Sequence, residues 1–428
     1  MNLKRYLPIL DWAPQYRRNQ ATRDLVAAVI VTVMLIPQSL AYALLAGLPA
    51  QVGLYASILP LVIYAVFGTS RTLSVGPVAV VSLMPAAALA PLAEAGTPEY
   101  VSGAILLAVM SGLILTLMGI FRLGFLVNFL SHPVVSGFVT ASGIVIAASQ
   151  LKHIFGIQAS GHNLLEIGQS LLLTIDDTNL ATLAIGIGVL LFLMLARKHL
   201  KPFLMAVGLA PRSADILAKS APIVAILATT LVAWQFQLDD RGVRLVGNVP
   251  RGLPELALPS LDMGLWQQLA VSALLISVVG FVESVSVGQT LAAKRRQRID
   301  PDQELIGLGT ANLGAGFSGG MPVTGGFSRS VVNFDAGAET PAAGAYAAVG
   351  IALLLTPAIA YLPQATLAAT IIVAVATLID FPALGRTWRY SRTDFGAMLA
   401  TIVLTLVHSV EAGLIAGVAL SIGLFLYH

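Results

Sequence analysis

Apolar segments of membrane-spanning length recur along the whole 428-residue chain, and they constrain its fold more than any other feature. A helix that crosses about 30 Å of hydrocarbon needs roughly 20 mostly apolar residues. Counting such stretches gives fourteen, which leaves no room for a sizeable soluble domain. They lie near residues 24–46, 50–68, 72–92, 100–121, 125–150, 178–196, 220–237, 268–291, 303–318, 322–337, 342–361, 364–380, 393–408 and 410–427.

The composition agrees with a membrane protein and excludes other classes. Hydrophobic residues make up 57% of the chain and charged residues 11%, with a mean hydropathy of +0.86. Soluble domains carry about a quarter charged residues, so an ordinary water-soluble enzyme is excluded. The absence of cysteine excludes disulfides and thiolate metal sites. High apolar content with a net charge of only +3 excludes a disordered chain. We therefore predict an all-α membrane protein.

The basic residues are unevenly divided between the two sides that fourteen crossings would create. If the N-terminus is cytoplasmic, 19 of the 24 Lys and Arg residues face the cytoplasm, four face the outside, and Arg329 lies within a span. This asymmetry follows the positive-inside rule. We expect a multi-pass protein of the cell inner membrane with both termini cytoplasmic. No cleavable signal peptide is visible at the N-terminus.

Two unusual features recur at matching places in the two halves of the chain. Gln38 lies in the first span, and Gly76-Pro77 breaks the third. Gly76 comes 38 residues after Gln38. Glu283 lies in the eighth span, and Gly325-Gly326 breaks the tenth. Gly325 comes 42 residues after Glu283. Seven segments per half is an odd number, so the second half enters the membrane upside down. This is the layout of an inverted-repeat secondary transporter, although Gly and Pro are common enough in membrane helices for chance to compete.

Each break predicts a short extended stretch followed by a half-helix. At the first break, Gly76 permits an unusual backbone turn and Pro77 suits the first position of a helix. At the second, Met321–Thr324 is predicted to be extended, and Phe327 to open a short helix. Half-helix N-termini carry unpaired N–H groups and a partial positive charge. Two such termini facing each other near the bilayer midplane would form an anion site.

Arg329 and Glu283 are the two charged residues placed deep within spans. An intramembrane charge is costly, so Arg329 needs a partner or a ligand. It would attract a substrate anion, or alternatively pair with Glu283 or snorkel to the cytoplasmic face. Burial makes Glu283 a candidate proton carrier or a salt-bridge partner. The two roles are compatible, because protonation of Glu283 would leave Arg329 free to hold an anion.

Other polar residues offer hydrogen bonds but no enzyme signature. Gln38 and Tyr42 share a helix face and suit oxyanion coordination, or alternatively join neighbouring helices. The hydroxyls of Ser39, Ser74, Thr324 and Ser328 could donate hydrogen bonds in the same way. The histidines are scattered without metal-ligand spacing, and there is no P-loop, Ser-His-Asp arrangement or nucleotide-binding fingerprint. We expect no catalytic residue, metal, cofactor or nucleic-acid partner.

Four motifs resemble the sulfate permease family, also called solute carrier family 26, which includes prestin. They are IPQSLAYALLAGLP (Ile36–Pro49), GLYAS (Gly53–Ser57), GTSRTLSVGPVAVVSLM (Gly68–Met84) and TGGFSRSVVN (Thr324–Asn333). The resemblance covers essentially the whole chain. It implies fourteen transmembrane segments as 7+7 inverted repeats, divided into a core domain and a gate domain. It also implies that the core moves against the gate like an elevator.

The resemblance implies the following division of the chain. Residues 1–23 form a cytoplasmic N-terminal segment and 239–267 an extracytoplasmic loop. The remaining ranges are core at 24–122 and 268–361, and gate at 123–238 and 362–428. The anion would lie between the third and tenth half-helices, with substrate-facing residues Gln38, Tyr42, Val78, Ser328 and Arg329 and the coupling carboxylate Glu283.

Two departures from the family pattern affect the prediction. Sodium-coupled bicarbonate members have Asp at the eighth-span position and a hydroxyl one turn later, whereas this chain has Glu283 and Val287, which favours protons. Family chains usually continue into a cytoplasmic STAS domain, and the abrupt end at LFLYH favours a truncated chain.

The sequence thus predicts a homodimeric, elevator-type secondary transporter of sulfate, bicarbonate or dicarboxylate, coupled to protons by symport. An anion channel or a prestin-like voltage-responsive protein is the alternative. A nucleobase transporter of the same fold is weaker, because a neutral base does not require the buried cation Arg329.

Overall fold

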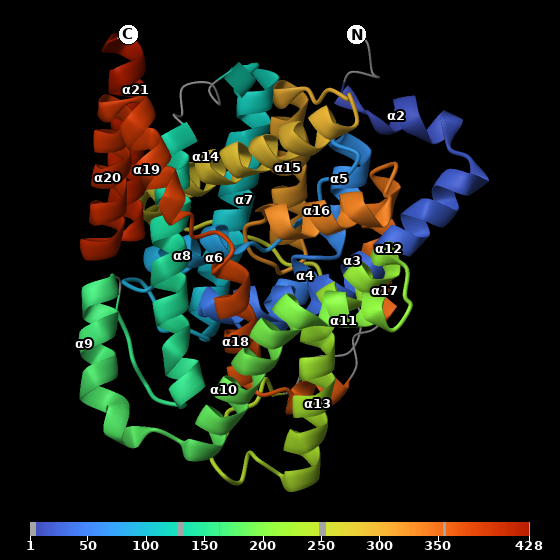
Figure 1. Cartoon of the computed structure of the whole chain (residues 1–428). Coiled ribbons are helices and arrows are strands. Elements are labelled where there is room, and N and C mark those ends of the chain that lie inside the picture. Colours follow the sequence, from blue (N-terminus) through green and yellow to red (C-terminus); the bar gives the residue numbers. More distant parts are fainter. Residues whose placement is uncertain (1–5, 126–131, 162, 248–253, 354–356, 428) are drawn as a thin grey trace. The chain divides into compact units, whose positions relative to one another are not determined.

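The regular structure of the computed structural model is almost entirely helical (Figure 1). The chain forms two compact units, each built from two separate stretches of sequence. Unit 1 comprises Met1–Leu130 and Gly252–Leu355, and unit 2 comprises Ser131–Arg251 and Thr356–His428. The structure describes residues 6–125, 132–161, 163–247, 254–353 and 357–427.

Unit 1 contains two short strands among its helices. Its first stretch forms α2 (Ile9–Trp12), a 3-10 turn (Ala13–Gln15), α3 (Arg18–Leu45), α4 (Ala50–Tyr55), α5 (Leu59–Phe67), β1 (Val75–Gly76), α6 (Ala79–Leu89) and α7 (Pro98–Ile120). Its second stretch forms α14 (Met263–Lys294), α15 (Pro301–Phe317), β2 (Thr324–Gly325), α16 (Phe327–Ala336) and α17 (Ala342–Leu353). The strands β1 and β2 pair antiparallel, so the two stretches of unit 1 meet at them.

Small residues allow the helices of unit 1 to pack closely. α7 and α15 lie side by side, with Gly112 and Gly309 at their contact (Figure 1). A Cβ atom added to Gly112 would lie 2.7 Å from the Leu313 backbone nitrogen and 2.8 Å from the Gly309 carbonyl oxygen. Glycine is therefore required here by the close approach of two backbones.

The regular elements described in unit 2 are helices, apart from an isolated bridge between Leu245 and Pro363. α8 packs against α18, α20 and α10, and alanines of α13 and α18 join a buried cluster with α10. Its elements are α8 (His132–Phe155), α9 (Leu164–Thr174), a 3-10 turn (Ile175–Asp177), α10 (Leu180–Leu195), a π-helical turn (Ala196–Leu200), α11 (Lys201–Ala206), α12 (Pro211–Lys219), α13 (Ala221–Phe236), a 3-10 turn (Pro357–Tyr361), α18 (Gln364–Val375), α19 (Phe381–Tyr390), α20 (Arg392–Val407) and α21 (Val410–Tyr427).

Each of the fourteen predicted apolar segments coincides with one or more of these helices. By length and composition, six helices of the described residues could cross a membrane, or up to seven if the bent α12–α13 pair counts as one span. Four further apolar helices, Ala79–Leu89, Ala342–Leu353, Gln364–Val375 and Ala412–Ser421, are shorter. The count of fourteen crossings therefore stays a prediction.

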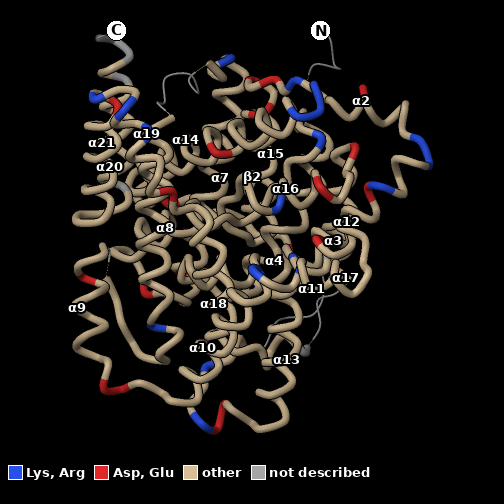
Figure 2. The backbone as a smooth tube through the Cα atoms, in the orientation of Figure 1, with Lys and Arg blue, Asp and Glu red and all other residues tan. Residues whose placement is uncertain are grey.

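Charged residues are rare along the helices and are most frequent in connections and near helix ends (Figure 2). Many large apolar side chains on the long helices remain exposed, including Leu25 and Val29 on α3 and Leu191 on α10. Apolar faces of this kind suit a lipid environment. These long apolar helices identify the chain as a multi-pass membrane protein.

Several boundaries differ from the sequence prediction. α3 begins at Arg18 rather than near residue 24, and α14 begins at Met263 rather than near 268. Parts of the predicted segments, namely residues 1–5, 126–131, 248–253, 354–356 and 428, lie outside the described residues. The division into core and gate segments stays a prediction at this point.

We predict that Gly112→Ala destabilises the protein by about 2 kcal/mol, because the added methyl group overpacks two backbones that cannot separate cheaply. The matched control is Gly188→Ala on α10, where an added Cβ meets nothing within 4 Å. Thermal unfolding in detergent measures both. Equal melting temperatures for the two variants would contradict the close α7–α15 contact.

Candidate functional site

The two broken spans meet through the strand pair. Val75 of β1 pairs with Gly325 of β2, and Gly76 pairs with Thr324. The Gly326 N–H also donates to the Ser74 carbonyl over 3.2 Å. α6 and α16 each begin within three residues of this pair, so their N-termini lie next to the same short stretch of sheet.

The two half-helix N-termini are alike in having no side-chain cap in the described structure. α6 begins after Val78 and α16 after Gly326, and among the described residues no side chain caps either N-terminus. The first N–H groups of a helix have no intrahelical partner and carry partial positive charge. The predicted extended-then-helical pattern at each break is therefore present, with N–H groups that suit an anion.

Arg329, in the first turn of α16, lies against the start of the other half-helix. Its side chain is 2% exposed, and Nη1 donates to the Pro77 carbonyl oxygen over 2.6 Å. Within the described part of the chain, Nε and Nη2 are buried without a hydrogen-bond partner. Unpaired donors on a buried cation are costly, so this edge of the guanidinium suits an anionic ligand.

Glycines make room for this guanidinium. A Cβ added to Gly76 would lie 3.3 Å from Arg329 Nη2, and one added to Gly326 would lie 3.2 Å from the same atom.

The prediction that Gly76 adopts an unusual turn is wrong, because Gly76 is part of β1 and does not have a positive φ. The prediction that Pro77 opens the helix is also wrong, since α6 begins at Ala79 and Pro77 contributes its carbonyl instead.

Glu283 lies near Arg329 without a direct ion pair. No ion pair within 4.0 Å joins Glu283 to Arg329 among the described residues. The Glu283 Oε2 atom is buried and has no hydrogen-bond partner there. The structure thus favours a guanidinium free for a ligand over the alternative of a closed Glu283–Arg329 pair.

The prediction that Glu283 is the only acidic residue deep within the helices is wrong. Asp24 and Glu304 are fully buried, whereas Glu283 is partly exposed. Glu304 accepts hydrogen bonds from the Tyr64 hydroxyl and from the Thr69 and Ser70 N–H groups. Both residues lie near the ends of predicted spans, and this position concealed their burial.

The remaining predicted site residues lie on α3, directly before α6 and on α16. Gln38 and Tyr42 of α3 are each 8% exposed, and so is Val78, the residue before α6. A Cβ on Gly326 would lie 3.1 Å from the Val78 Cγ2 atom, which places Val78 beside the second break. Ser328 is exposed on the first turn of α16. Their roles in binding stay predictions.

α14 holds the second break through Ser284, which the sequence analysis missed, and this hydroxyl meets Thr324, which was predicted only as a possible hydrogen-bond donor. The Ser284 and Thr324 hydroxyls are 2.6 Å apart, and the Gly325 N–H donates to Ser284 Oγ over 2.8 Å. Thr324 Oγ1 also lies 2.6 Å from the Gly280 carbonyl oxygen, which accepts its proton. Ser284 directly follows Glu283, so the strand pair and the carboxylate are tied to one helix.

α15 and α16 contribute further contacts. The Asn312 amide donates to the Val323 carbonyl over 2.8 Å and accepts from the Val323 N–H over 2.9 Å. The Ser74 N–H donates to Ser330 Oγ over 2.9 Å. A Ser, Thr or Asn inside an apolar segment could have indicated these anchors, but not which backbone group each one binds.

Buried hydroxyls near the two breaks remain unpaired in the described structure. They are Ser74 Oγ and Ser82 Oγ, on the approach to α6 and within it, and Asn333 Oδ1 of α16 is unpaired as well. Ser74 was among the hydroxyls that could donate to a ligand; Ser82 and Asn333 had no distinguishing sequence signal. Unpaired polar atoms of this kind mark a site for water or a polar ligand.

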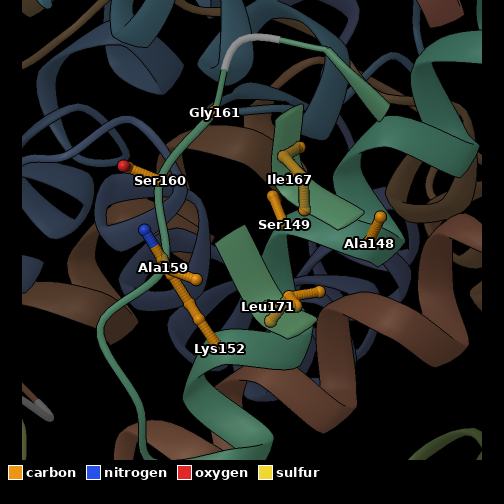
Figure 3. A pocket seen from close by; sticks show the side chains of 8 residues that line it. All are labelled: Ala148, Ser149, Lys152, Ala159, Ser160, Gly161, Ile167 and Leu171. Carbon is orange, nitrogen blue, oxygen red and sulfur yellow. The ribbon is translucent and has the colours of Figure 1, made fainter. Parts of the chain in front are cut away.

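Unit 2 has a separate small cavity of about 30 Å³ (Figure 3). Lys152, Ser149 and Ser160 line it together with apolar side chains such as Ile167 and Leu171. Its size suits a group about as large as a water molecule. None of the predicted substrate-facing residues lines it. The described residues also contain no cluster of three His, Asp or Glu side chains that could hold a metal ion.

The sequence matches the model of the sulfate permease family over residues 22–401. The chain belongs to the sulfate permease family. It is 37% identical to sulfate transporter 4.1, chloroplastic, from Arabidopsis thaliana over 98% of this chain and 60% of that protein. It is 34% identical to a probable sulfate transporter of Mycobacterium tuberculosis over 96% of this chain and 72% of that protein.

Solved structures of anion transporters share the fold. SLC26A9 superposes with a TM-score of 0.90 at 25% identity, over 99% of this chain and 68% of that one. The transmembrane domain of the cyanobacterial bicarbonate transporter BicA superposes with a TM-score of 0.79 at 22% identity, over 94% of this chain and 98% of that one. The chain spans about three fifths of the length of the Arabidopsis relatives it matches.

We predict that Gly326→Ala weakens anion binding about tenfold, because its methyl group would press on both Arg329 Nη2 and Val78. The backbone φ of Gly326 is −84°, so alanine is not strained there and the effect arises from contact alone. Gly385→Ala on α19, in open space, is the control. Equilibrium binding of labelled sulfate measures both, and equal affinities would show that the guanidinium does not need this space.

Proposed function

We propose that the protein is a secondary active transporter of small anions, and that its binding site is the strand pair with the two half-helices. The observation that carries this proposal is Arg329, a buried guanidinium with two unpaired donors beside two uncapped helix N-termini. Membership of the sulfate permease family supports transport rather than catalysis.

Sulfate is the first candidate substrate. Nε and Nη2 form one edge of a guanidinium, and such an edge donates two parallel hydrogen bonds to two oxygens of one anion. Sulfate, bicarbonate and dicarboxylates all present such oxygen pairs. The names of the Arabidopsis and Mycobacterium relatives favour sulfate, and the likeness to BicA keeps bicarbonate as an alternative.

Gln38, Tyr42, Val78 and Ser328 complete the proposed site. The amide of Gln38 and the hydroxyls of Tyr42 and Ser328 would donate to the anion's remaining oxygens. Val78 would limit its size at the start of α6. All four belong to unit 1: Gln38 and Tyr42 lie on α3, Val78 directly before α6, and Ser328 on α16.

Transport is proposed to follow an elevator-type cycle. Unit 1 would be the core domain that carries the anion, and unit 2 the gate domain against which the core moves. The matched breaks at β1–α6 and β2–α16 support two inverted repeats of seven segments. The proposed setting is the cell inner membrane, with both termini cytoplasmic and two chains forming a dimer.

Glu283 is proposed to couple transport to protons. Ionised, its charge opposes the binding of an anion at Arg329; protonated, it leaves the guanidinium charge uncompensated and the anion favoured. Proton and anion would then bind together, which is the requirement for symport. Val287, an apolar residue one turn along α14, gives no oxygen to a sodium ion.

We predict that Arg329→Ala lowers the affinity for the transported anion by at least about a hundredfold, because it removes the charge and both donors. Arg389→Ala removes an exposed arginine of α19 and serves as the control. Proteoliposomes with radiolabelled sulfate, bicarbonate or fumarate provide the assay and identify the substrate. If uptake by Arg329→Ala saturates at the same anion concentration as uptake by the unmodified protein, Arg329 is not part of the site. Large unitary currents without saturation would favour a channel.

We predict that Glu283→Gln uncouples transport from the pH gradient, since glutamine mimics the protonated carboxyl and does not titrate. An inwardly directed proton gradient should accelerate uptake several-fold in the unmodified protein and leave the variant unaffected. Glu94→Gln, at an exposed position before α7, controls for the loss of one charge. Proton-driven accumulation that survives Glu283→Gln would contradict the proposed coupling.

A further inference from the structure

The C-terminal end of α16 lies in a polar junction that the anion site itself does not use. α16 ends at Ala336 and is followed by Gly337 with φ +98°. The Gly337 N–H donates to the Phe334 carbonyl over 3.1 Å, and the Ala338 N–H donates to the Asn333 carbonyl over 3.0 Å. These bonds close the helix, and the connection to α17 starts immediately after it.

Arg295, the residue that follows α14, binds this helix end. Its Nη2 donates to the Phe334 carbonyl over 2.9 Å and its Nη1 donates to the Ala338 carbonyl. The guanidinium also lies 4.2 Å from the centre of the Phe334 ring. A cation at a helix C-terminus offsets the partial negative charge there, and a planar fork with two bonds and a stacked ring fixes its direction as well.

Asp24 of α3 holds the same connection from another helix. Its carboxylate is fully buried and accepts from the Glu339 N–H over 2.7 Å and from the Thr340 N–H over 3.2 Å. The Thr340 hydroxyl donates to it as well. Arg295 and Asp24 therefore hold four residues of this connection, Phe334, Ala338, Glu339 and Thr340, to the end of α14 and to α3.

The helices joined by this junction are the ones that carry the proposed anion site. α3 carries Gln38 and Tyr42, α14 carries Glu283, and α16 carries Arg329. α16 has only ten residues, which corresponds to about 15 Å along its axis. A short helix moves as a rigid body, so a shift at its C-terminal end displaces its first turn.

We propose that Arg295 is a positioning residue, which sets the place of Arg329 relative to α3 and α14 by fixing the far end of α16. This inference rests on the proposed function, because it assigns Arg295 a role in the affinity of that site. Arg295 touches neither the anion nor Arg329 directly. Its effect passes along one short helix.

Lys294 provides a matched control within the same junction. Its ammonium lies 5.7 Å from the centre of the Phe334 ring, so it shares the charge and the location of Arg295. Among the described residues no hydrogen bond joins Lys294 to the carbonyls at the end of α16. Lys294→Ala therefore removes a charge without removing the two bonds.

The test uses a single introduced thiol, because the chain has no cysteine. Phe327→Cys places it on the exposed first turn of α16, at a residue with no proposed contact to the anion, where a charged methanethiosulfonate reagent can react with it. Two quantities are measured in proteoliposomes: the labelling rate without anion, and the sulfate concentration that halves this rate. Arg295→Ala, Arg295→Lys and Lys294→Ala are each combined with Phe327→Cys.

With Arg295→Ala, we expect the labelling rate without anion to change about threefold or more, and the half-protective sulfate concentration to rise about tenfold. Arg295→Lys keeps the charge and one hydrogen bond. Its labelling rate and half-protective concentration should lie between those of the parent and those of Arg295→Ala. Arg295→Lys carries the test if Arg295→Ala does not fold. Lys294→Ala should leave both quantities within about twofold of the parent.

Unchanged labelling and protection in both Arg295 variants, even with a lower melting temperature, would overturn the inference and leave Arg295 a purely structural residue. Equal effects of Lys294→Ala and Arg295→Ala would also overturn it, because charge alone would then explain them. If neither sulfate, bicarbonate nor fumarate protects the parent thiol, the proposed function fails, while the labelling rates without anion still decide whether Arg295 positions α16.

Discussion

The hydrogen bond from Arg329 to the Pro77 carbonyl joins the two broken spans across 252 residues of sequence. It fixes one side of a buried guanidinium and leaves the Nε and Nη2 donors of the other side unpaired. A buried cation with unpaired donors is unfavourable in a membrane protein unless a ligand accepts hydrogen bonds from those donors. The strand pair, the glycines beside the guanidinium and the uncapped half-helices all serve this arrangement.

The surrounding helices hold the two breaks with neutral hydrogen bonds. Ser284 and Asn312 bind the backbone of residues 323–325, so the site's geometry does not depend on a competing carboxylate. Buried acids are satisfied elsewhere, as at Asp24 and Glu304. Glu283 differs, with a buried oxygen that has no partner in the described structure. This separation leaves atoms of Arg329 and Glu283 without partners in the described structure, as the proposed binding of an anion and a proton requires.

Local sequence signals predicted the elements of the site but not their contacts. Apolar length and low charge indicated membrane helices, and the Gly-Pro and Gly-Gly breaks indicated half-helices after extended residues, as β1–α6 and β2–α16 show. The role of Gly76 was misjudged because it depends on Arg329, which is distant in sequence. Asp24 and Arg295 were missed for the same reason, since their partners lie more than 300 and about 40 residues away.

A density map of the protein in selenate, a heavier analogue of sulfate, tests the central claim most directly. The account predicts a bound anion within hydrogen-bonding distance of Arg329 Nε and Nη2 and beside the first turns of α6 and α16. It also predicts that the Arg329–Pro77 hydrogen bond is retained. An empty site at saturating selenate, with Arg329 turned into a closed pair with Glu283, would contradict it.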